Sequence, residues 1–132
     1  MKAWHDYHIS GYRVQSIDRV ITIDLVWNYQ SETNIPSAKV IFSGVQGYEF
    51  RNDGMGSIVL DFEEYDIDEF FESFGAAIEK SYATTGAFGG WTANMPKAKE
   101  AFKNSNAKAY VLNASYGLEG WVISNAVEEV YA

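Results

Sequence analysis

The sequence contains no cysteine and only two histidines, and these shortages exclude several kinds of chemistry. Without cysteine the chain has no disulfide, no cysteine-ligated zinc, no iron–sulfur cluster and no thiol nucleophile. The histidines, His5 and His8, are close neighbours near the start, so a serine nucleophile would have only these two as a histidine base. Histidine-dependent catalysis is thereby confined to one short segment.

Long apolar runs are also missing. No window approaches the roughly 18 apolar residues that a membrane-spanning helix requires. The early residues are interrupted by charged side chains such as Asp6, Arg13 and Arg19, so they lack the apolar core of a secretory signal. We therefore expect no membrane partner, and we expect the protein to reside in the cytoplasm.

Basic residues are scarce relative to acidic ones. Ten Lys and Arg stand against 18 Asp and Glu, which gives a formal net charge of −8 at pH 7. Phosphate-rich partners require a basic surface, so we expect no nucleic acid as a partner. The negative charge keeps a small protein in solution, and it would also attract a basic partner.

The composition is otherwise that of a folded protein. Apolar residues make up 47% and aromatic residues 16% of the 132 residues, with four Trp, nine Tyr and eight Phe. This content supplies the buried area that a disordered chain lacks, and a chain of this length can build a core without cross-links. No repeat or low-complexity tract divides the sequence, so we predict one globular domain over residues 1–132.

Alternation of apolar and polar residues predicts a mainly antiparallel β-sheet. Ile21, Ile23 and Leu25 alternate with Thr22 and Asp24, the period-two pattern of a half-buried strand. The same pattern predicts about six to seven strands in total. They cover residues 7–14, 19–27, 38–43, 48–50, 57–63, 108–115 and 121–127.

Three stretches interrupt these strands. The polar residues 28–37 predict a loop, and Gly44 with Gly47 predicts a bulge or bend within one strand. The glycine-rich residues 84–90 predict an irregular connection. Because they match neither the dinucleotide fingerprint nor the phosphate-binding loop, we expect no cofactor.

Two helices are predicted between the strands. Residues 66–82 carry apolar side chains at helical spacing, with Asp66 as N-cap and Glu69 completing a capping box. This predicts one long amphipathic helix packed across the sheet. A short second helix is predicted over residues 95–103, with Asn94 as its cap and Pro96 in the first turn. The predicted fold class is therefore α+β.

The segment around His5 is the one cluster of residues suited to catalysis or metal binding. On a strand, Asp6 and His8 would share a face about 7 Å apart, and His5 would point the other way. Asp6 and His8 are thus candidate metal ligands only, and we predict no metal site, because a catalytic zinc needs a third protein ligand from elsewhere. One alternative function is accordingly a small hydrolase or metal-dependent enzyme that uses Asp6 and His8 with a carboxylate such as Glu63.

Acidic residues are concentrated between residues 51 and 80. Nine of the 18 carboxylates lie there, with no basic residue among them. A paired-carboxylate site for glycoside hydrolysis is one interpretation, and a solvated acidic face is another. A docking surface for a basic protein is a third, and its candidate residues are Asp61, Glu63, Glu64, Asp68 and Glu72.

The four tryptophans divide into two pairs. Trp27 and Trp121 lie on strands and are expected in the core. Trp4 and Trp91 flank irregular segments, so we expect them to be exposed and available to a partner. A carbohydrate-binding or purely structural module is therefore a further alternative, in which Trp4 and Trp91 would form a flat exposed strip.

Three short segments resemble small bacterial proteins grouped with the immunity proteins of polymorphic toxin systems. They are Trp4-His5-Asp6, Val40-Ile41-Phe42-Ser43-Gly44-Val45, and Ser115-Tyr116-Gly117 with Gly120-Trp121. The resemblance implies a non-enzymatic protein-binding module that inhibits a protein partner, and it brings no catalytic residues. Together with the charge, it predicts an acidic surface presented to a basic partner.

Overall fold

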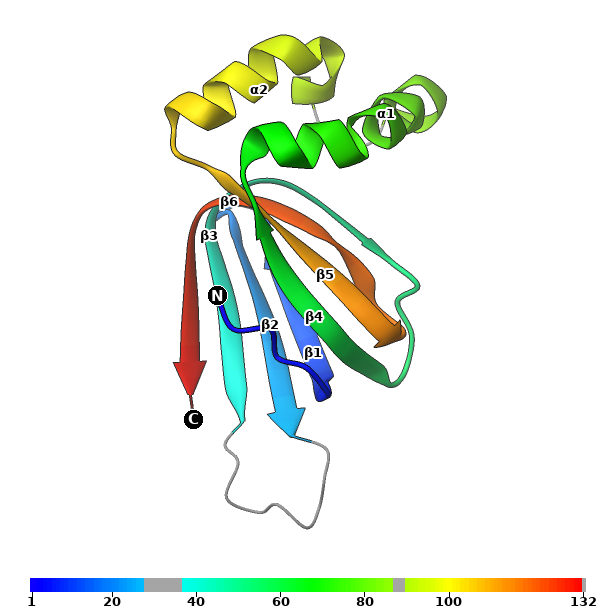
Figure 1. The fold of residues 1–132 in the computed structure, drawn as a ribbon, viewed down its shortest axis with the longest axis vertical. Coiled ribbons are helices and arrows are strands. Elements are labelled where there is room, and N and C mark those ends of the chain that lie inside the picture. The colour runs from blue at the N-terminus through cyan, green and yellow to red at the C-terminus, as the bar shows by residue number, and fades with distance from the viewer. Residues whose placement is uncertain (28–36, 87–89, 132) are drawn as a thin grey trace.

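The computed structural model describes residues 1–27, 37–86 and 90–131. Within them the chain forms six strands, two α-helices and one 3-10 helix (Figure 1). In chain order these are β1 (Tyr7–Gln15), β2 (Val20–Trp27), β3 (Ala38–Arg51), β4 (Ser57–Tyr65), α1 (Ile67–Thr85), η1 (Gly90–Asn94), α2 (Met95–Asn104), β5 (Lys108–Tyr116) and β6 (Glu119–Tyr131). The α+β class and the mainly antiparallel sheet are confirmed.

The sheet closes into a barrel in the order β1-β2-β3-β6-β5-β4, with every pairing antiparallel. The bend predicted at the two glycines is present, because the register of β3 against β6 shifts between Val45 and Gly47. Gly44 has a φ of 62°, a conformation that favours glycine. Residues 38–43 of β3 pair with β2, and the rest of β3 continues past the end of β2.

The barrel interior holds the main core. It contains the alternating residues Ile21, Ile23 and Leu25 of β2, as predicted, together with Val40 and Phe42 of β3. The pattern of residues 57–63 predicts that Leu60 and Phe62 share one face and Val59 the other, and this is wrong because two register shifts occur near the start of β4. As a result Val59 and Phe62 are both buried, whereas Leu60 is 42% exposed.

A second core lies between the helices and the outer face of β5 and β6. Phe70 of α1 and Phe102 of α2 pack there with Val111, Trp121 and Ile123. The two helices lie together beyond one end of the barrel (Figure 1). Both predicted caps are present, since Asp66 accepts a hydrogen bond from the backbone N–H of Glu69 at 2.7 Å and Asn94 accepts one from Lys97 at 3.1 Å.

The prediction of one long amphipathic helix across the sheet is corrected. The fully buried side chains of α1 are confined to Ile67, Phe70 and Ile78. Ala77 and Tyr82, which the pattern placed on the buried stripe, are exposed. The physical reason is that α1 packs with α2 over the small outer surface of β5 and β6, so its last turns extend beyond the sheet.

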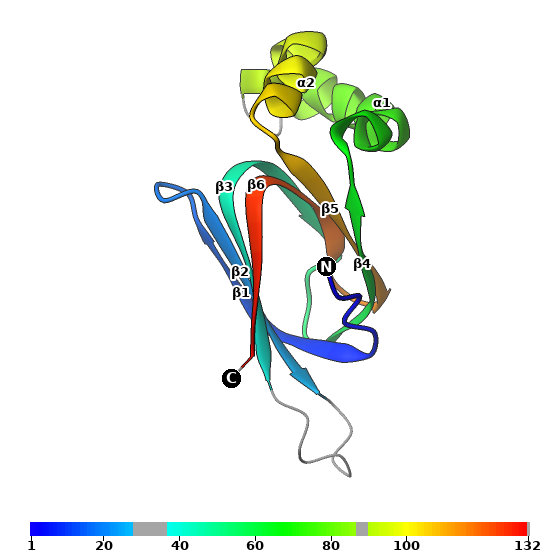
Figure 2. The ribbon, with the colours of Figure 1, turned by 60° about the vertical axis from the view of Figure 1, so that its left-hand side comes forward.

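The residues before β1 complete the barrel wall. β1 and β4 pair only at His8↔Ile58 and Ile9↔Ser57. Beyond this short ladder the first residues lie along β4: the backbone N–H of Phe62 donates to Ala3 at 3.1 Å, and that of Asp6 donates to Val59 at 2.9 Å. Figure 2 shows this N-terminal segment between β4 and β6. Most of the predicted loop at 28–37 and part of the glycine-rich connection at 84–90 lie outside the described residues.

Candidate functional site

Two of the five predicted docking carboxylates, Asp68 and Asp61, have polar partners within the fold, and Glu72 has none in the described part of the chain. Asp68 lies 3.1 Å from Lys99 Nζ and 2.9 Å from Lys103 Nζ, which joins α1 to α2. Hydrogen bonds from Lys103 and Lys99 lower the pKa of Asp68 below its ordinary value. Asp61 accepts a hydrogen bond from Asn113 Nδ2 at 2.8 Å. Glu72 is exposed and has no ion pair among the described residues.

The other two candidates, Glu63 and Glu64, are neighbours on β4 and therefore point to opposite faces. Glu64 lies opposite Tyr110, a barrel-interior residue. Burial, and after it the charge of Glu64, raises the pKa of Tyr110. Glu63 lies on the outer face, where its hydrogen bond with the Tyr65 hydroxyl is the main cause of a raised pKa of Tyr65. The five candidate carboxylates therefore do not form one surface.

A smaller acidic group lies along β4 beside Tyr65. Asp61, Glu63 and Tyr65 alternate on the outer face of this strand, and after the hydrogen bond with Glu63 the charges of Asp61 and Glu69 also raise the pKa of Tyr65. Glu72 follows Glu69 by one helical turn on α1. We call Asp61, Glu63, Glu69 and Glu72 the acidic face. Tyr65, which is half-buried at its edge, was not predicted, although it continues the period-two spacing of Asp61 and Glu63.

The His5 segment does not form the predicted cluster. Asp6 has a φ of 66° and precedes β1, so it does not share a strand face with His8. Its partner is His5, whose Nε2 lies 3.4 Å from the carboxylate, while His5 Nδ1 lies 2.7 Å from the Leu60 carbonyl. Because Asp6 meets β4 at Val59, Glu63 lies about 13 Å farther along that strand. Among the described residues no three His, Asp or Glu side chains gather as metal ligands.

Trp4 and Trp91 are not exposed platforms. The expected exposure of Trp4 is wrong: its side chain is completely buried, with a ring contact to Tyr7 at 4.9 Å. The cause is the N-terminal segment, which carries Trp4 into the barrel. Trp91 is half-buried and contacts Phe102 at 5.4 Å. A Cβ on Gly47 would lie 2.9 Å from the Trp91 ring, so this tryptophan packs directly on the bend of β3.

The edge of β1 beyond its two pairs with β4 faces the second half of β3 and the connection that follows it, and we call the space between them the cleft. Two pockets lie along this cleft. One, of about 330 Å³, is lined by residues 14–16, 19–21 and 45–48. The other, of about 450 Å³, is lined by residues 9–12, 53–57 and Leu118. Pockets at such openings of a barrel are common ligand sites, and neither pocket was predicted because each forms between segments that are distant in the sequence.

Tyr12 bridges the cleft at the larger of the two pockets. Its ring lies 5.1 Å from Phe50, and its hydroxyl donates a hydrogen bond to the carboxylate of Asp53. That hydrogen bond, with burial and the charge of Asp53, raises the pKa of Tyr12 to about 12. The hydroxyl is therefore neutral at physiological pH and fixes the width of the cleft at this point.

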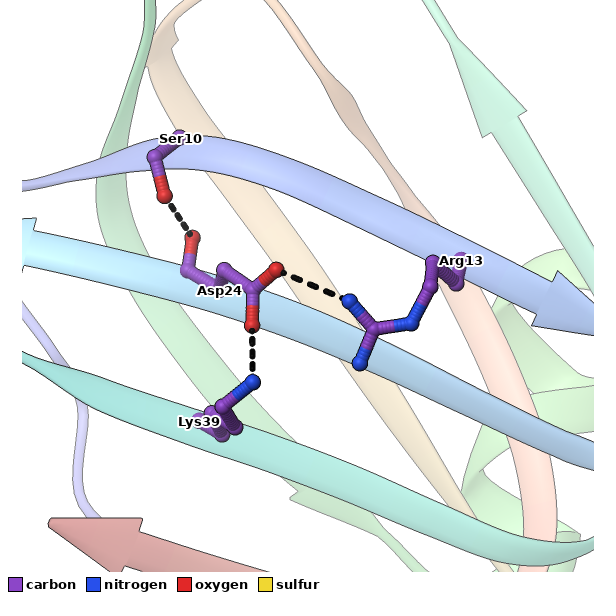
Figure 3. Close-up of polar contacts among 4 residues, drawn as sticks. All are labelled: Ser10, Arg13, Asp24 and Lys39. Atoms are coloured by element: carbon purple, nitrogen blue, oxygen red, sulfur yellow. Dashed lines mark hydrogen bonds and ion pairs between the residues drawn. The ribbon is translucent and has the colours of Figure 1, made fainter. Parts of the chain in front are cut away.

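The outer face of β1, β2 and β3 carries an ion-pair cluster (Figure 3). Asp24 lies 3.3 Å from Arg13 Nη1 and 3.2 Å from Lys39 Nζ, so one carboxylate joins cations of both neighbouring strands. Ser10 donates a hydrogen bond to the Asp24 carbonyl at 3.4 Å. Because each charge has a partner on the adjacent strand, this cluster stabilises strand register.

Comparison of the chain with protein-family models, curated proteins and solved structures finds no match in any of the three. The class is therefore defined by the architecture: an α+β protein built on a closed antiparallel barrel with a helical pair packed outside it. In the described part of the chain, neither α-helix has the length and apolar content needed to cross a bilayer.

Proposed function

We propose that the protein is a non-enzymatic protein-binding module, of the immunity-inhibitor type, whose acidic face receives a basic partner. The observation that carries this proposal is that Asp61, Glu63 and Tyr65 alternate on the outer face of β4, where neither carboxylate has an ion pair among the described residues. A tyrosine beside carboxylates can bury its aromatic ring against a partner while the carboxylates attract cationic side chains.

The charge balance of the face supports this role. Asp68 has two lysine partners, whereas Glu63, Glu69 and Glu72 have no ion pair among the described residues. Unpaired carboxylates keep their attraction for a cationic partner, and paired ones do not. The proposed face is therefore narrower than the acidic run in the sequence suggests, and it excludes Asp68.

The competing functions have less support from the geometry. The hydrolase alternative needs Asp6, His8 and Glu63 in one place, and the path along β4 separates Asp6 from Glu63 by about 13 Å. The carbohydrate alternative needs Trp4 at the surface, and Trp4 is buried. A protein-binding role requires neither arrangement.

The test compares affinity capture by the wild-type protein with capture by charge-reversal variants, using extract of the cells that express it. Glu63→Lys and Glu72→Lys should lose a partner that the wild type retains. Glu128→Lys is the matched control, because it makes the same charge change at an exposed site on β6. The purified partner should then associate about tenfold more slowly when salt is raised from 20 to 200 mM.

Two results would contradict the proposal. One is a captured partner that all three variants retain equally, because the acidic face would then make no contact. The other is an association rate that does not change with salt. Tyr65→Phe adds a control for the ring, since it keeps the aromatic surface and removes only the hydroxyl that contacts Glu63.

A further inference from the structure

The pocket between the β1–β2 hairpin and the bend of β3, which we call the hairpin pocket, lies away from the acidic face. Figure 2 shows the hairpin on the opposite side of the molecule from β4 and α1. The pocket has a volume of about 330 Å³, within the range of small-ligand sites. Its walls come from the ends of β1 and β2 and from the bend of β3, three segments that the closed barrel holds in fixed register.

The lining of the hairpin pocket combines apolar side chains with hydrogen-bond donors. Val14, which is half-buried, provides apolar surface, and Tyr48 adds an exposed aromatic ring. Gln15, Ser16 and Gln46 contribute polar groups. Such a lining suits a small ligand with an apolar body and one polar end.

The charge of the pocket is opposite to that of the protein. Arg19 is the one charged residue among the described lining residues, although the chain as a whole has a net charge of −8. Asp18, its neighbour in the hairpin turn, is exposed and is not part of the lining. Arg19 is also exposed, and it does line the pocket. A cation beside apolar surface favours a ligand whose polar end is an anion.

Arg19 is held at this position by the fold. Its carbonyl accepts a hydrogen bond from the Val45 N–H at 3.0 Å, and its Nη1 donates to the Val45 carbonyl at 3.2 Å. Its φ is 55°, a left-handed conformation that costs a side-chain-bearing residue free energy. A guanidinium has five N–H donors, and the bond to Val45 is the one hydrogen bond it makes among the described residues.

The geometry points to the hairpin pocket as a binding site for a small apolar carboxylate, whose carboxylate pairs with Arg19 and whose body packs on Val14 and Tyr48. The remaining guanidinium donors can form the two parallel hydrogen bonds that a carboxylate accepts from arginine. This inference does not depend on the proposed function, because the acidic face contributes no residue to the pocket.

The test uses 2-naphthoate as the probe and 2-naphthamide as its uncharged counterpart, each titrated into the isotope-labelled full chain and followed by NMR. Saturable shifts should be confined to residues 14–16, 19–21 and 45–48. The carboxylate should bind at least about tenfold more tightly than the amide, because only the carboxylate forms a charge-assisted pair with the guanidinium.

Variants separate recognition by Arg19 from its structural role. Arg19→Gln should abolish the difference between the two probes, and Arg19→Lys should keep part of it because the positive charge remains. Arg13→Gln is the matched control, since it removes an arginine from the same hairpin but outside the pocket. The amide shifts of the free variants show whether the barrel is intact.

The inference is overturned by any of three results. The first is the absence of saturable shifts in the pocket at millimolar naphthoate, and the second is equal affinity for naphthoate and naphthamide. The third is an unchanged preference in Arg19→Gln. Charge reversal of Glu63 or Glu72 should leave naphthoate binding intact, so failure here and failure of the proposed docking face are distinguishable.

Discussion

Tyr12 of β1 donates a hydrogen bond across the open cleft to Asp53, which belongs to the connection between β3 and β4. The two residues are 41 positions apart, and both line the larger of the two pockets of the cleft. The hydrogen bond therefore joins the unpaired edge of β1 to the connection between β3 and β4. The protonation state of the Tyr12 hydroxyl should consequently affect the free energy of unfolding.

Removal of the Tyr12 hydroxyl should destabilise the protein at neutral pH and should matter less in strong base. The pKa of Tyr12 is raised from 10.0 to about 12, so its stabilising contribution is fully present below pH 10 and is lost as the pH rises towards 12. Tyr12→Phe should lower the free energy of unfolding by about 1 kcal/mol at pH 8. Urea unfolding of both proteins at pH 8 and pH 11 measures the change, and a gap that does not narrow at pH 11 refutes it.

Loss of the Asp68 ion pairs should have the opposite pH dependence. Hydrogen bonds from Lys103 and Lys99 lower the pKa of Asp68 in the folded state. Its contribution is therefore present above the ordinary pKa of 3.8 and is lost as the pH falls through the lowered value. Asp68→Asn should be less stable than wild type at pH 7 and equal to it near pH 2. The control is Glu72→Gln, which removes an unpaired carboxylate of the same helix and should show no such convergence.

Truncation of Trp4 should be among the most damaging single substitutions. Its side chain is completely buried, and it contacts Tyr7 and Tyr131 from a segment outside any strand. Trp4→Ala should cost about 3–5 kcal/mol in urea unfolding, because it leaves a large cavity at the barrel wall. Met55→Ala, at a 99% exposed position, should change stability by less than about 0.5 kcal/mol. A small effect for Trp4→Ala would mean that the N-terminal segment does not close the barrel.

Replacement by alanine should affect stability very differently at two glycines, Gly120 and Gly54. A Cβ on Gly120 would lie 1.8 Å from the Glu49 carbonyl oxygen, because β6 passes very close to β3 there. Gly120→Ala should therefore destabilise the protein by about 3 kcal/mol or more. Gly54 has no atom within 4 Å of an added Cβ, and Gly54→Ala should be nearly neutral. Thermal unfolding of both variants tests the contrast, which would be contradicted by equal melting temperatures.

Local pattern predicted the elements of this fold well. Alternation located β2, helical spacing and caps located α1 and α2, and the pair Gly44 and Gly47 located the bend of β3. These features depend on neighbours in sequence. Closure of the barrel, in contrast, depends on a pairing between β1 and β4 of only two residue pairs, which no periodicity can reveal.

The candidate sites were less predictable for the same reason. The acidic run was visible, but only the packing of α2 against α1 shows that lysines neutralise Asp68. Trp4 looked exposed because it precedes the first strand, and burial in the barrel arises from contacts with β4 that are distant in sequence. Arg19 was predicted only as the first residue of a strand, because the pocket beside it requires the bend of β3.

The backbone N–H of Lys2 donates to the Glu129 carboxylate at 2.7 Å, across a sequence separation of 127 residues. During synthesis, Glu129 and the rest of β6 therefore leave the ribosome after the other strands of the barrel. Until β6 has emerged, the barrel wall against which Trp4 packs is incomplete, and the apolar surface of the N-terminal segment stays accessible to chaperones or to other nascent chains. Assembly of the barrel is consequently a late event that joins segments far apart in the sequence, and topologies with such distant contacts fold slowly.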